Sequence, residues 1–338
     1  PQSIRSMIYE GKQATEEEVK ELYRPHQLIS YQQYRGFLDS LLQTATPLYL
    51  DRSDRTFYEQ ISKQNSESGK AEIRDVKGIL DEMRVIKESM EVDRLQKACN
   101  ITAKALTNVM KECDPEMYEF EIESVIEGTF LEYGAAMPGF PSIVGSGPNG
   151  VILHYDKNRR TAEAGDLVVV DIGAEFGYYT ADITRTFPVS GRFSPRQKAL
   201  YDLVLGAWNA GLEVIRPGAT MGEVNQAVRE FLETQSGDLC GETTCAPYLI
   251  HGVSHWLGMD VHDVGDNRAP FVAGMVLTLE PGLYLQVEEV GIRVEDDILV
   301  TEDGHEVLSA GLPRSTVEIE TIMDETPHWV AGIFPGQG

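Results

Sequence analysis

Hydrophobic and polar residues follow a helical period most clearly in the second quarter of this chain. Apolar residues recur every three or four positions over residues 89–112, and the Asp114-Pro115 pair that follows predicts the end of a long amphipathic helix. A second helix is predicted over residues 118–134, YEFEIESVIEGTFLEYG. Strand-like segments come next, so the order is helix, proline turn, helix and strands.

The same order returns about a hundred residues later, which indicates an internal duplication. Ser194 supplies an N-cap and Pro195 the first helical position, and an apolar stripe then runs to the Arg-Pro-Gly stop at residues 216–218. Thr220 and Glu223 form a capping box for the next helix, EVNQAVREFLETQ. Each copy therefore predicts two helices that lead into a hairpin.

Alternating polar and apolar positions predict the first hairpin in the segment LVVVDIGAEFGYYTADITRTF, which is rich in β-branched and aromatic residues. If the turn centres on Phe176-Gly177, Asp171 and Asp182 face each other on one side of the sheet. Two carboxylates held with Cβ atoms roughly 5 Å apart repel each other unless a cation lies between them. This pair argues for a metal.

A second pair of carboxylates comes from the second copy, where GMVLTLEPGLYL and VGIRVEDDILVT are predicted to form the hairpin. Glu280 and Glu295 lie in these strands, and Glu280, like Asp171, directly follows an apolar strand. A buried carboxylate without a partner is costly. Together with His255, the four acids make a mainly oxygen donor set, which suits a hard or borderline cation such as Mn²⁺. Four acids exceed the need of one catalytic metal and match two ions about 3.5–4 Å apart.

The segments around these patterns suggest three parts of the chain. Residues 1–75 are polar, with weak helical patterning in EEEVKELY and YRGFLDSLL, one strand-like stretch, TPLYLD, and a loop, SKQNSESGK. They are interpreted as a partial N-terminal α/β domain, apparently truncated, followed by an α+β domain over residues 76–325. Residues 326–338 form a C-terminal tail, in which Trp329 and Phe334 could dock on the body or on a partner.

Charge and composition exclude several classes of function. A net charge of −25 and a pI near 4.6 argue against nucleic acid and anionic membrane surfaces, and favour divalent cations and neutral or cationic small substrates. No apolar run reaches the roughly 18 residues of a membrane helix. Four cysteines are too few and too irregular for a disulfide framework, so free buried thiols in a reducing compartment, the cytoplasm, are predicted.

Histidines gather near the acidic strands. Four of the seven, His154, His251, His255 and His262, lie in or near these stretches, whereas the other three (His26, His305 and His328) are interpreted as ordinary core or surface residues. The stretch GSGPNG before His154 satisfies G-x-G-x-x-G literally. Because VILHY after it is predicted to be a strand and not a helix, a dinucleotide-binding site is rejected.

The segments VDIGAEFGYYTADITRTF, HGVSHWLGMDVHDVG, TLEPGLYL, GIRVEDDILVT and GSGPNGVILHY resemble aminopeptidase P, a proline-specific metallopeptidase of the pita-bread fold. The resemblance covers about residues 76–325 and includes the pseudo-twofold duplication. It implies two metal ions, usually Mn²⁺ with Co²⁺ or Zn²⁺ as alternatives. The implied ligands are Asp171, Asp182, His255, Glu280 and Glu295.

The same resemblance implies how substrate is handled. His154 and His262 would contact substrate or stabilise the tetrahedral intermediate, and His251, Tyr284 and Arg293 would line the pocket for the proline ring. Release of the first residue from a peptide with proline second is the implied activity, and a homo-oligomer, dimer or tetramer, is the implied assembly.

Charge and bond chemistry agree with that activity. Water activated by two divalent ions would attack the carbonyl before proline, with Glu280 as general base and acid. An X-Pro bond lacks an amide N–H and has a restricted φ, so most peptidases handle it poorly. The free amine of the first residue would lie near the acidic cluster.

Alternative functions stay open. Prolidase, which takes only Xaa-Pro dipeptides, shares the fold and the five ligands, although Ser254 and the GSGPNG stretch favour aminopeptidase P by resemblance. Methionine aminopeptidase fits the EDDILVT continuation less well, and creatinase-like enzymes lack the full ligand set. A non-catalytic pita-bread binding protein would be expected to have lost ligands.

Overall fold

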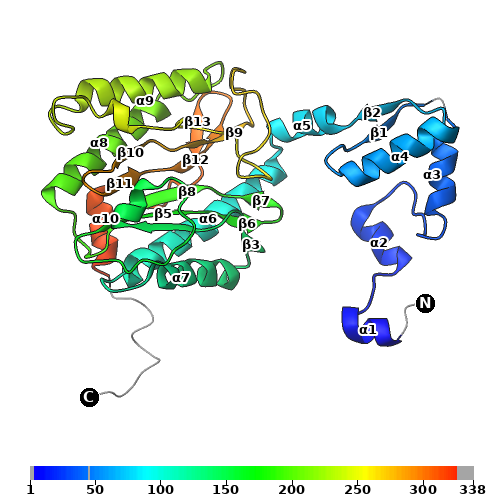
Figure 1. The fold of residues 1–338 in the computed structure, drawn as a ribbon, viewed down its shortest axis with the longest axis horizontal. Helices are drawn as coiled ribbons and strands as arrows, with labels where there is room; N and C mark the ends of the chain where they lie inside the picture. The colour runs from blue at the N-terminus through cyan, green and yellow to red at the C-terminus, as the bar shows by residue number, and fades with distance from the viewer. Residues whose placement is uncertain (1–3, 45, 326–338) are drawn as a thin grey trace. The chain divides into compact units, whose positions relative to one another are not determined.

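The computed structural model describes residues 4–44 and 46–325, and the chain divides into two compact units, Pro1–Leu80 and Asp81–Gly338 (Figure 1). The predictions for the tail, residues 326–338, lie outside the described residues.

The first unit packs helices against a two-stranded parallel sheet. Its small core consists of buried Leu38, Leu42, Leu50, Ile61 and Ala71. The predicted helices and strand are all present here. Its elements are α1 (Ile4–Glu10), α2 (Glu16–Tyr23), α3 (Tyr34–Leu42), β1 (Leu48–Leu50), α4 (Arg55–Ser68) and β2 (Ile73–Asp75), and α5 (Lys77–Val85) follows.

The loop predicted over SKQNSESGK is wrong, because α4 continues to Ser68. Asp54 caps this helix by accepting a hydrogen bond from the backbone N–H of Phe57 at 2.9 Å. Ile61 is completely buried in the core of the unit, and the Asn65 side chain bonds both the N–H and the carbonyl of Ala71. Ile61, with partly buried Phe57 and Tyr58, packs α4 on the core, whereas the SKQNSESGK stretch has the polar composition of a loop.

The second unit contains the duplicated helix pairs at the predicted positions. In Figure 1 the strands lie between α6–α7 on one side and α8–α9 on the other. The N-cap at Ser194 and the capping box at Thr220 form as predicted, since each hydroxyl accepts from the backbone N–H three residues later. These helices are α6 (Ser89–Glu112), α7 (Glu119–Glu132), α8 (Pro195–Leu212) and α9 (Met221–Gln235), and α10 (Thr316–Met323) closes the unit.

The strands of the two copies meet in the middle of this unit. Antiparallel pairing joins β4 (Ile143–Ser146), β5 (Leu167–Ile172) and β8 (Ile183–Pro188); β3 (Met137–Pro138), β6 (Ala174–Phe176) and β7 (Tyr179–Thr180); β9 (Val276–Leu279), β12 (Asp296–Val300) and β13 (His305–Val307); and β10 (Gly282–Leu285) with β11 (Val290–Arg293). The Glu295 N–H donates to the Thr184 carbonyl at 3.1 Å, which connects β8 of the first copy to the second.

The predicted register of the first hairpin is wrong by one residue in its turn. Phe176 pairs with Tyr179, so Gly177 and Tyr178 are the two turn residues, both with positive φ (59° and 72°). Positive φ at both central positions gives the primed turn whose twist matches the strands. Asp171 therefore pairs with Thr184, and Asp182 is its diagonal neighbour on the same face.

The strand predicted over residues 151–155 is also wrong. A 3₁₀ helix, η1 (Gly147–Val151), and a turn replace it. The backbone at Gly150 packs closely against Gly291, because a Cβ on Gly291 would lie 1.8 Å from the Gly150 carbonyl oxygen. No α-helix follows GSGPNG in this described segment, so the anion site of a dinucleotide motif does not form.

One cysteine prediction is wrong and the other is confirmed. Cys99 and Cys113 are free and buried, but Cys240 and Cys245 form a disulfide between α9 and η2 (Ala246–Tyr248). The intervening turn, with positive φ at Gly241, brings the two Cα atoms to 5.2 Å, within bonding range. Across residues 4–44 and 46–325, none of the helices combines the length and apolarity of a membrane span.

Candidate metal centre

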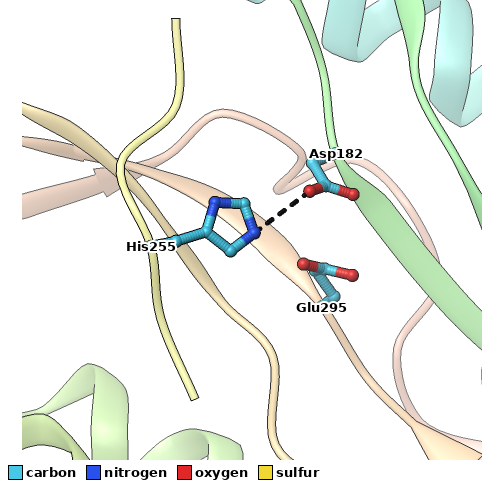
Figure 2. A group of neighbouring side chains, drawn as sticks. All are labelled: Asp182, His255 and Glu295. Carbon is cyan, nitrogen blue, oxygen red and sulfur yellow. Dashed lines mark ion pairs between the residues drawn. The ribbon is translucent and has the colours of Figure 1, made fainter. Parts of the chain in front are cut away.

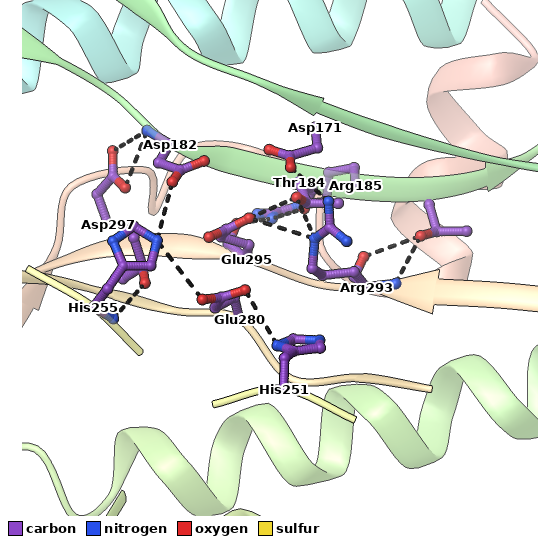
Figure 3. Close-up of polar contacts among 12 residues, drawn as sticks. Asp171, Asp182, Thr184, Arg185, His251, His255, Glu280, Arg293, Glu295 and Asp297 are labelled. Carbon is purple, nitrogen blue, oxygen red and sulfur yellow. Dashed lines mark hydrogen bonds and ion pairs between the residues drawn. The ribbon is translucent and has the colours of Figure 1, made fainter. Parts of the chain in front are cut away.

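Five side chains from separate elements meet around one cavity of about 230 Å³ (Figure 3). Asp171 lies within β5, Asp182 just before β8, Glu280 after β9, Glu295 between β11 and β12, and His255 on the segment after η2. Each acid lies in a strand or at a strand end, where the backbone is fixed by ladder hydrogen bonds. The hairpins of the two copies therefore supply the four acids, and the segment after η2 adds His255.

Distances among these groups allow shared ligation. Ligand atoms of Asp182, His255 and Glu295 all lie within 4.8 Å of one another (Figure 2). His255 Nε2 is 3.3 Å from Asp182 Oδ2 and 3.7 Å from Glu280 Oε1. Its Nδ1 lies 3.1 Å from the Trp256 carbonyl, which leaves Nε2 directed at the carboxylates.

The buried carboxylates of the cavity carry more negative charge than the neighbouring basic side chains neutralise, which favours a bound cation. Burial and repulsion from neighbouring carboxylates raise the pKa of Asp182 and of Glu295 well above the ordinary range. Burial raises the pKa of Glu280 to about 7. In the described part of the chain, Arg293 is the sole lysine or arginine that pairs with any of these acids, and Asp171 Oδ1 is buried without a hydrogen bond. Oxygen-rich, under-neutralised ligands of this kind fit divalent metal ions.

A layer of polar residues fixes the ligands from behind. Thr184 Oγ1 donates to Glu295 Oε2 at 2.6 Å and accepts from Arg293 Nε at 2.9 Å. The backbone N–H of Asp182 points at the Asp297 carboxylate, at 3.1 and 3.3 Å, and burial raises the pKa of Asp297 to about 7. Sequence reasoning missed Asp297, although three consecutive acids after an apolar strand were a visible signal.

Arg185 and Asp296 form a buried ion pair that sequence reasoning also missed. Arg185 Nη2 lies 2.7 Å from Asp296 Oδ1, and both side chains are fully buried. Arg185 Nη1 donates to the carbonyls of Thr184 and Glu295, at 2.9 and 2.7 Å. The pair therefore ties the strand of one ligand to the strand of another.

The three predicted substrate histidines differ in environment. His154 and His262 are exposed and line the cavity, and the His262 ring meets the His255 ring edge-on at 4.5 Å. Burial, followed by His255, lowers the pKa of His262. His251 is half-buried, its Nε2 is 3.0 Å from Tyr284 Oη, and burial lowers its pKa to about 4.

Tyr284 and Arg293, which are predicted to line the proline pocket, are both buried. Arg293 is 3% exposed, and its Nη1 donates to Tyr284 Oη while its Nη2 bonds Asp171 Oδ2 at 2.5 Å. Arg293 lines the cavity, whereas Tyr284 stands behind His251. The structure thus makes Tyr284 a support of His251.

A buried ion pair also holds the loop that carries His262. Lys87 Nζ lies 3.3 Å from Asp263 Oδ2, with both side chains almost completely buried, and Arg84 pairs with the same carboxylate. Sequence reasoning missed this pair because its partners are far apart in the chain. Lys87 and Arg84 therefore anchor Asp263, the residue next to His262.

Comparison with curated proteins finds relatives named Xaa-Pro aminopeptidase. The chain is 40% identical over 284 residues to a Xaa-Pro aminopeptidase of Escherichia coli, covering 78% of this chain and 64% of that protein. It is 35% identical to the Haemophilus influenzae Xaa-Pro aminopeptidase, covering 94% and 78%. The chain thus spans less than two thirds of the Escherichia coli relative's length.

Solved structures show the same fold. Proline aminopeptidase P II from Yersinia pestis superposes with a TM-score of 0.87 at 34% identity, covering 95% of this chain and 81% of that one. Zinc-substituted Escherichia coli aminopeptidase P in complex with product gives 0.88 at 34% identity, covering 95% and 80%. The predicted pita-bread fold and the resemblance to aminopeptidase P are confirmed. Residues 93–302 match the model of metallopeptidase family M24, and the chain belongs to this family.

Proposed function

We propose that this chain is a metal-dependent exopeptidase that releases the N-terminal residue from peptides with proline in the second position. The observation that carries the proposal is the convergence of five metal-type ligands in one cavity that His251 and Arg293 also line. Relatives named Xaa-Pro aminopeptidase support the same activity.

Asp171, Asp182, His255, Glu280 and Glu295 would hold two divalent ions, for which the oxygen-rich donor set favours Mn²⁺, with Co²⁺ and Zn²⁺ as alternatives. Such ions, when bound, lower the pKa of a water molecule and polarise a carbonyl. Four carboxylates around one cavity carry more charge than a single ion would balance, which supports two.

Residues of the chain then move the proton and orient the peptide. Glu280 takes the proton from water and returns it to the proline nitrogen, since its carboxylate faces the cavity and has a pKa of about 7 without metal. His154 and His262 lie across the cavity, where they can contact the carbonyl oxygen as negative charge develops.

His251 binds the proline side of the substrate. Its pKa of about 4 keeps the imidazole neutral at neutral pH, so an uncharged ring faces the apolar pyrrolidine. Tyr284 fixes this ring through the 3.0 Å hydrogen bond, and Arg293 fixes Asp171 and Tyr284 together. In this proposal His251 contacts the proline ring directly, whereas Tyr284 and Arg293 act by holding their neighbours in place.

Hydrolysis of a matched peptide pair tests the proposal. Metal-stripped protein reloaded with Mn²⁺ should cleave Xaa-Pro-Yaa-Zaa after its first residue, with much slower cleavage of the N-acetylated peptide, because the free amine lies near the acidic cluster. Cleavage of the Xaa-Pro dipeptide alone would make the protein a prolidase. No cleavage of either peptide by metal-loaded protein would contradict both activities.

Three further predictions accompany this function. A homo-oligomer is tested by light scattering on the purified chain, and the division at residue 75 into a partial N-terminal domain and a catalytic domain is tested by limited proteolysis. A cytoplasmic location is tested by cell fractionation. Its sequence argument is weakened by the Cys240–Cys245 disulfide, because the cytosol keeps thiols reduced.

A further inference from the structure

A second cavity, also of about 230 Å³, adjoins the metal cavity. Its own walls come from apolar residues and one acid, and it shares four residues with the metal cavity. The walls are Phe140, Pro141, Ile143, Val261 and Asp156, and the shared residues are His154, Asp171, Asp182 and His262. A peptide bound over the ligands can therefore reach both cavities.

Asp156 is the one acid among the residues that line only the second cavity. It follows Tyr155, a buried residue whose hydroxyl donates to Glu119 Oε2 at 2.8 Å, and this anchor holds the segment in place. The Asp156 side chain itself is exposed and forms no ion pair with any residue in the described ranges. Of the cations on this segment, Arg160 pairs with Asp166 and Arg159 stacks over Phe120, while Lys157 beside Asp156 is exposed.

The position of the proline determines what the second cavity receives. His251 and Arg293 line the metal cavity and not the second one. With proline on the His251 side, the residue before the scissile bond extends across the ligands toward Phe140 and Asp156. Apolar walls fit an aliphatic stem, and a carboxylate at the rim fits a cation at its end.

Resting on the proposed function, we propose that Asp156 determines specificity for the first residue of the substrate and selects arginine or lysine there. The carboxylate contacts the guanidinium or ammonium group, while Phe140, Ile143 and Val261 contact the methylenes. Other acidic residues contribute a general field, but Asp156 supplies the local contact.

Steady-state kinetics on three peptides, Arg-Pro-Pro, Leu-Pro-Pro and Glu-Pro-Pro, test this. Wild-type enzyme with Mn²⁺ should show a higher kcat/KM for the arginine peptide than for the leucine peptide. Asp156→Asn should lower that ratio about fivefold, the upper range for a pair at an exposed site. Asp156→Lys should favour the glutamate peptide, and both effects should shrink at 1 M salt, where the screening length is about 3 Å.

The control is Asp93→Asn, which replaces another exposed aspartate that lines neither cavity. It should leave the arginine-to-leucine ratio within twofold. Normal cleavage of all peptides by Asp156→Asn with an unchanged ratio would overturn the specificity assignment alone. Failure of metal-loaded wild type to cleave any peptide would overturn the proposed function and this inference with it.

Discussion

Replacing Arg185 with methionine should destabilise the second unit strongly, because the change breaks a fully buried ion pair. Methionine keeps much of the apolar volume but leaves Asp296 with Arg314 as its remaining cation, at 2.7 Å. It also removes the donor to the carbonyls of Thr184, Glu295 and Pro313. Breaking a buried pair costs about 3–5 kcal/mol, so Tm should fall by roughly 10 °C in a unit of this size.

Arg192→Met provides the matched control. Arg192 also pairs with an aspartate, Asp324, but these side chains are 55% and 61% exposed, so the loss should stay below about 1 kcal/mol. Urea unfolding followed by circular dichroism measures both variants in metal-free protein. If Arg185→Met loses no more free energy of unfolding than Arg192→Met, the buried pair does not hold the strands together and the reasoning is wrong.

Three other variants or treatments probe catalysis, pH dependence and cysteine state. Glu280→Gln should lower kcat by about 10²–10⁴-fold while the circular dichroism spectrum stays native, and wild-type turnover at equal metal content would remove Glu280 from the mechanism. Burial depresses the pKa of His251 to about 4 from 6.5. The neutral ring's contribution to the free energy of unfolding is therefore fully present above pH 6.5 and is lost as pH falls toward 4. Between pH 6.5 and 4, the free energy of unfolding of metal-free wild type should therefore fall by up to about 3 kcal/mol more than that of His251→Gln. A difference in unfolding free energy that stays constant with pH would refute the burial argument. Alkylation of native protein should label Cys240 and Cys245 only after reduction, as measured by mass spectrometry; labelling without reductant would exclude the disulfide.

Local signals made the helices and ligands predictable. The caps at Ser194 and Thr220 and the apolar stripe over 89–112 are contained within a few helical turns. Asp171 and Glu280 stand out because each follows an apolar run of strand residues, and hairpin pairing and histidine clustering pointed to the remaining ligands. Such features depend on neighbouring residues, so the sequence carries them directly.

Contacts between distant residues were not predictable in this way. Arg185 and Asp296 are 111 residues apart, and their pairing exists only after β8 and β12 are placed side by side. The turn register depended on the positive φ of Tyr178, an uncommon conformation for tyrosine. Predicting the Cys240–Cys245 disulfide requires the path of the loop between the two cysteines. Predicting α4 requires knowing that Ile61 is buried.

The most direct test of the account is the number of divalent ions that the five side chains hold. Metal-stripped protein would be equilibrated with Mn²⁺, freed of excess, and assayed for bound metal per chain beside the Asp182→Asn/Glu295→Gln double variant. The account predicts two ions per wild-type chain, with loss of bound metal in the variant. Wild-type protein that binds no Mn²⁺, or a variant that retains the full amount, would contradict a metal centre at this cavity.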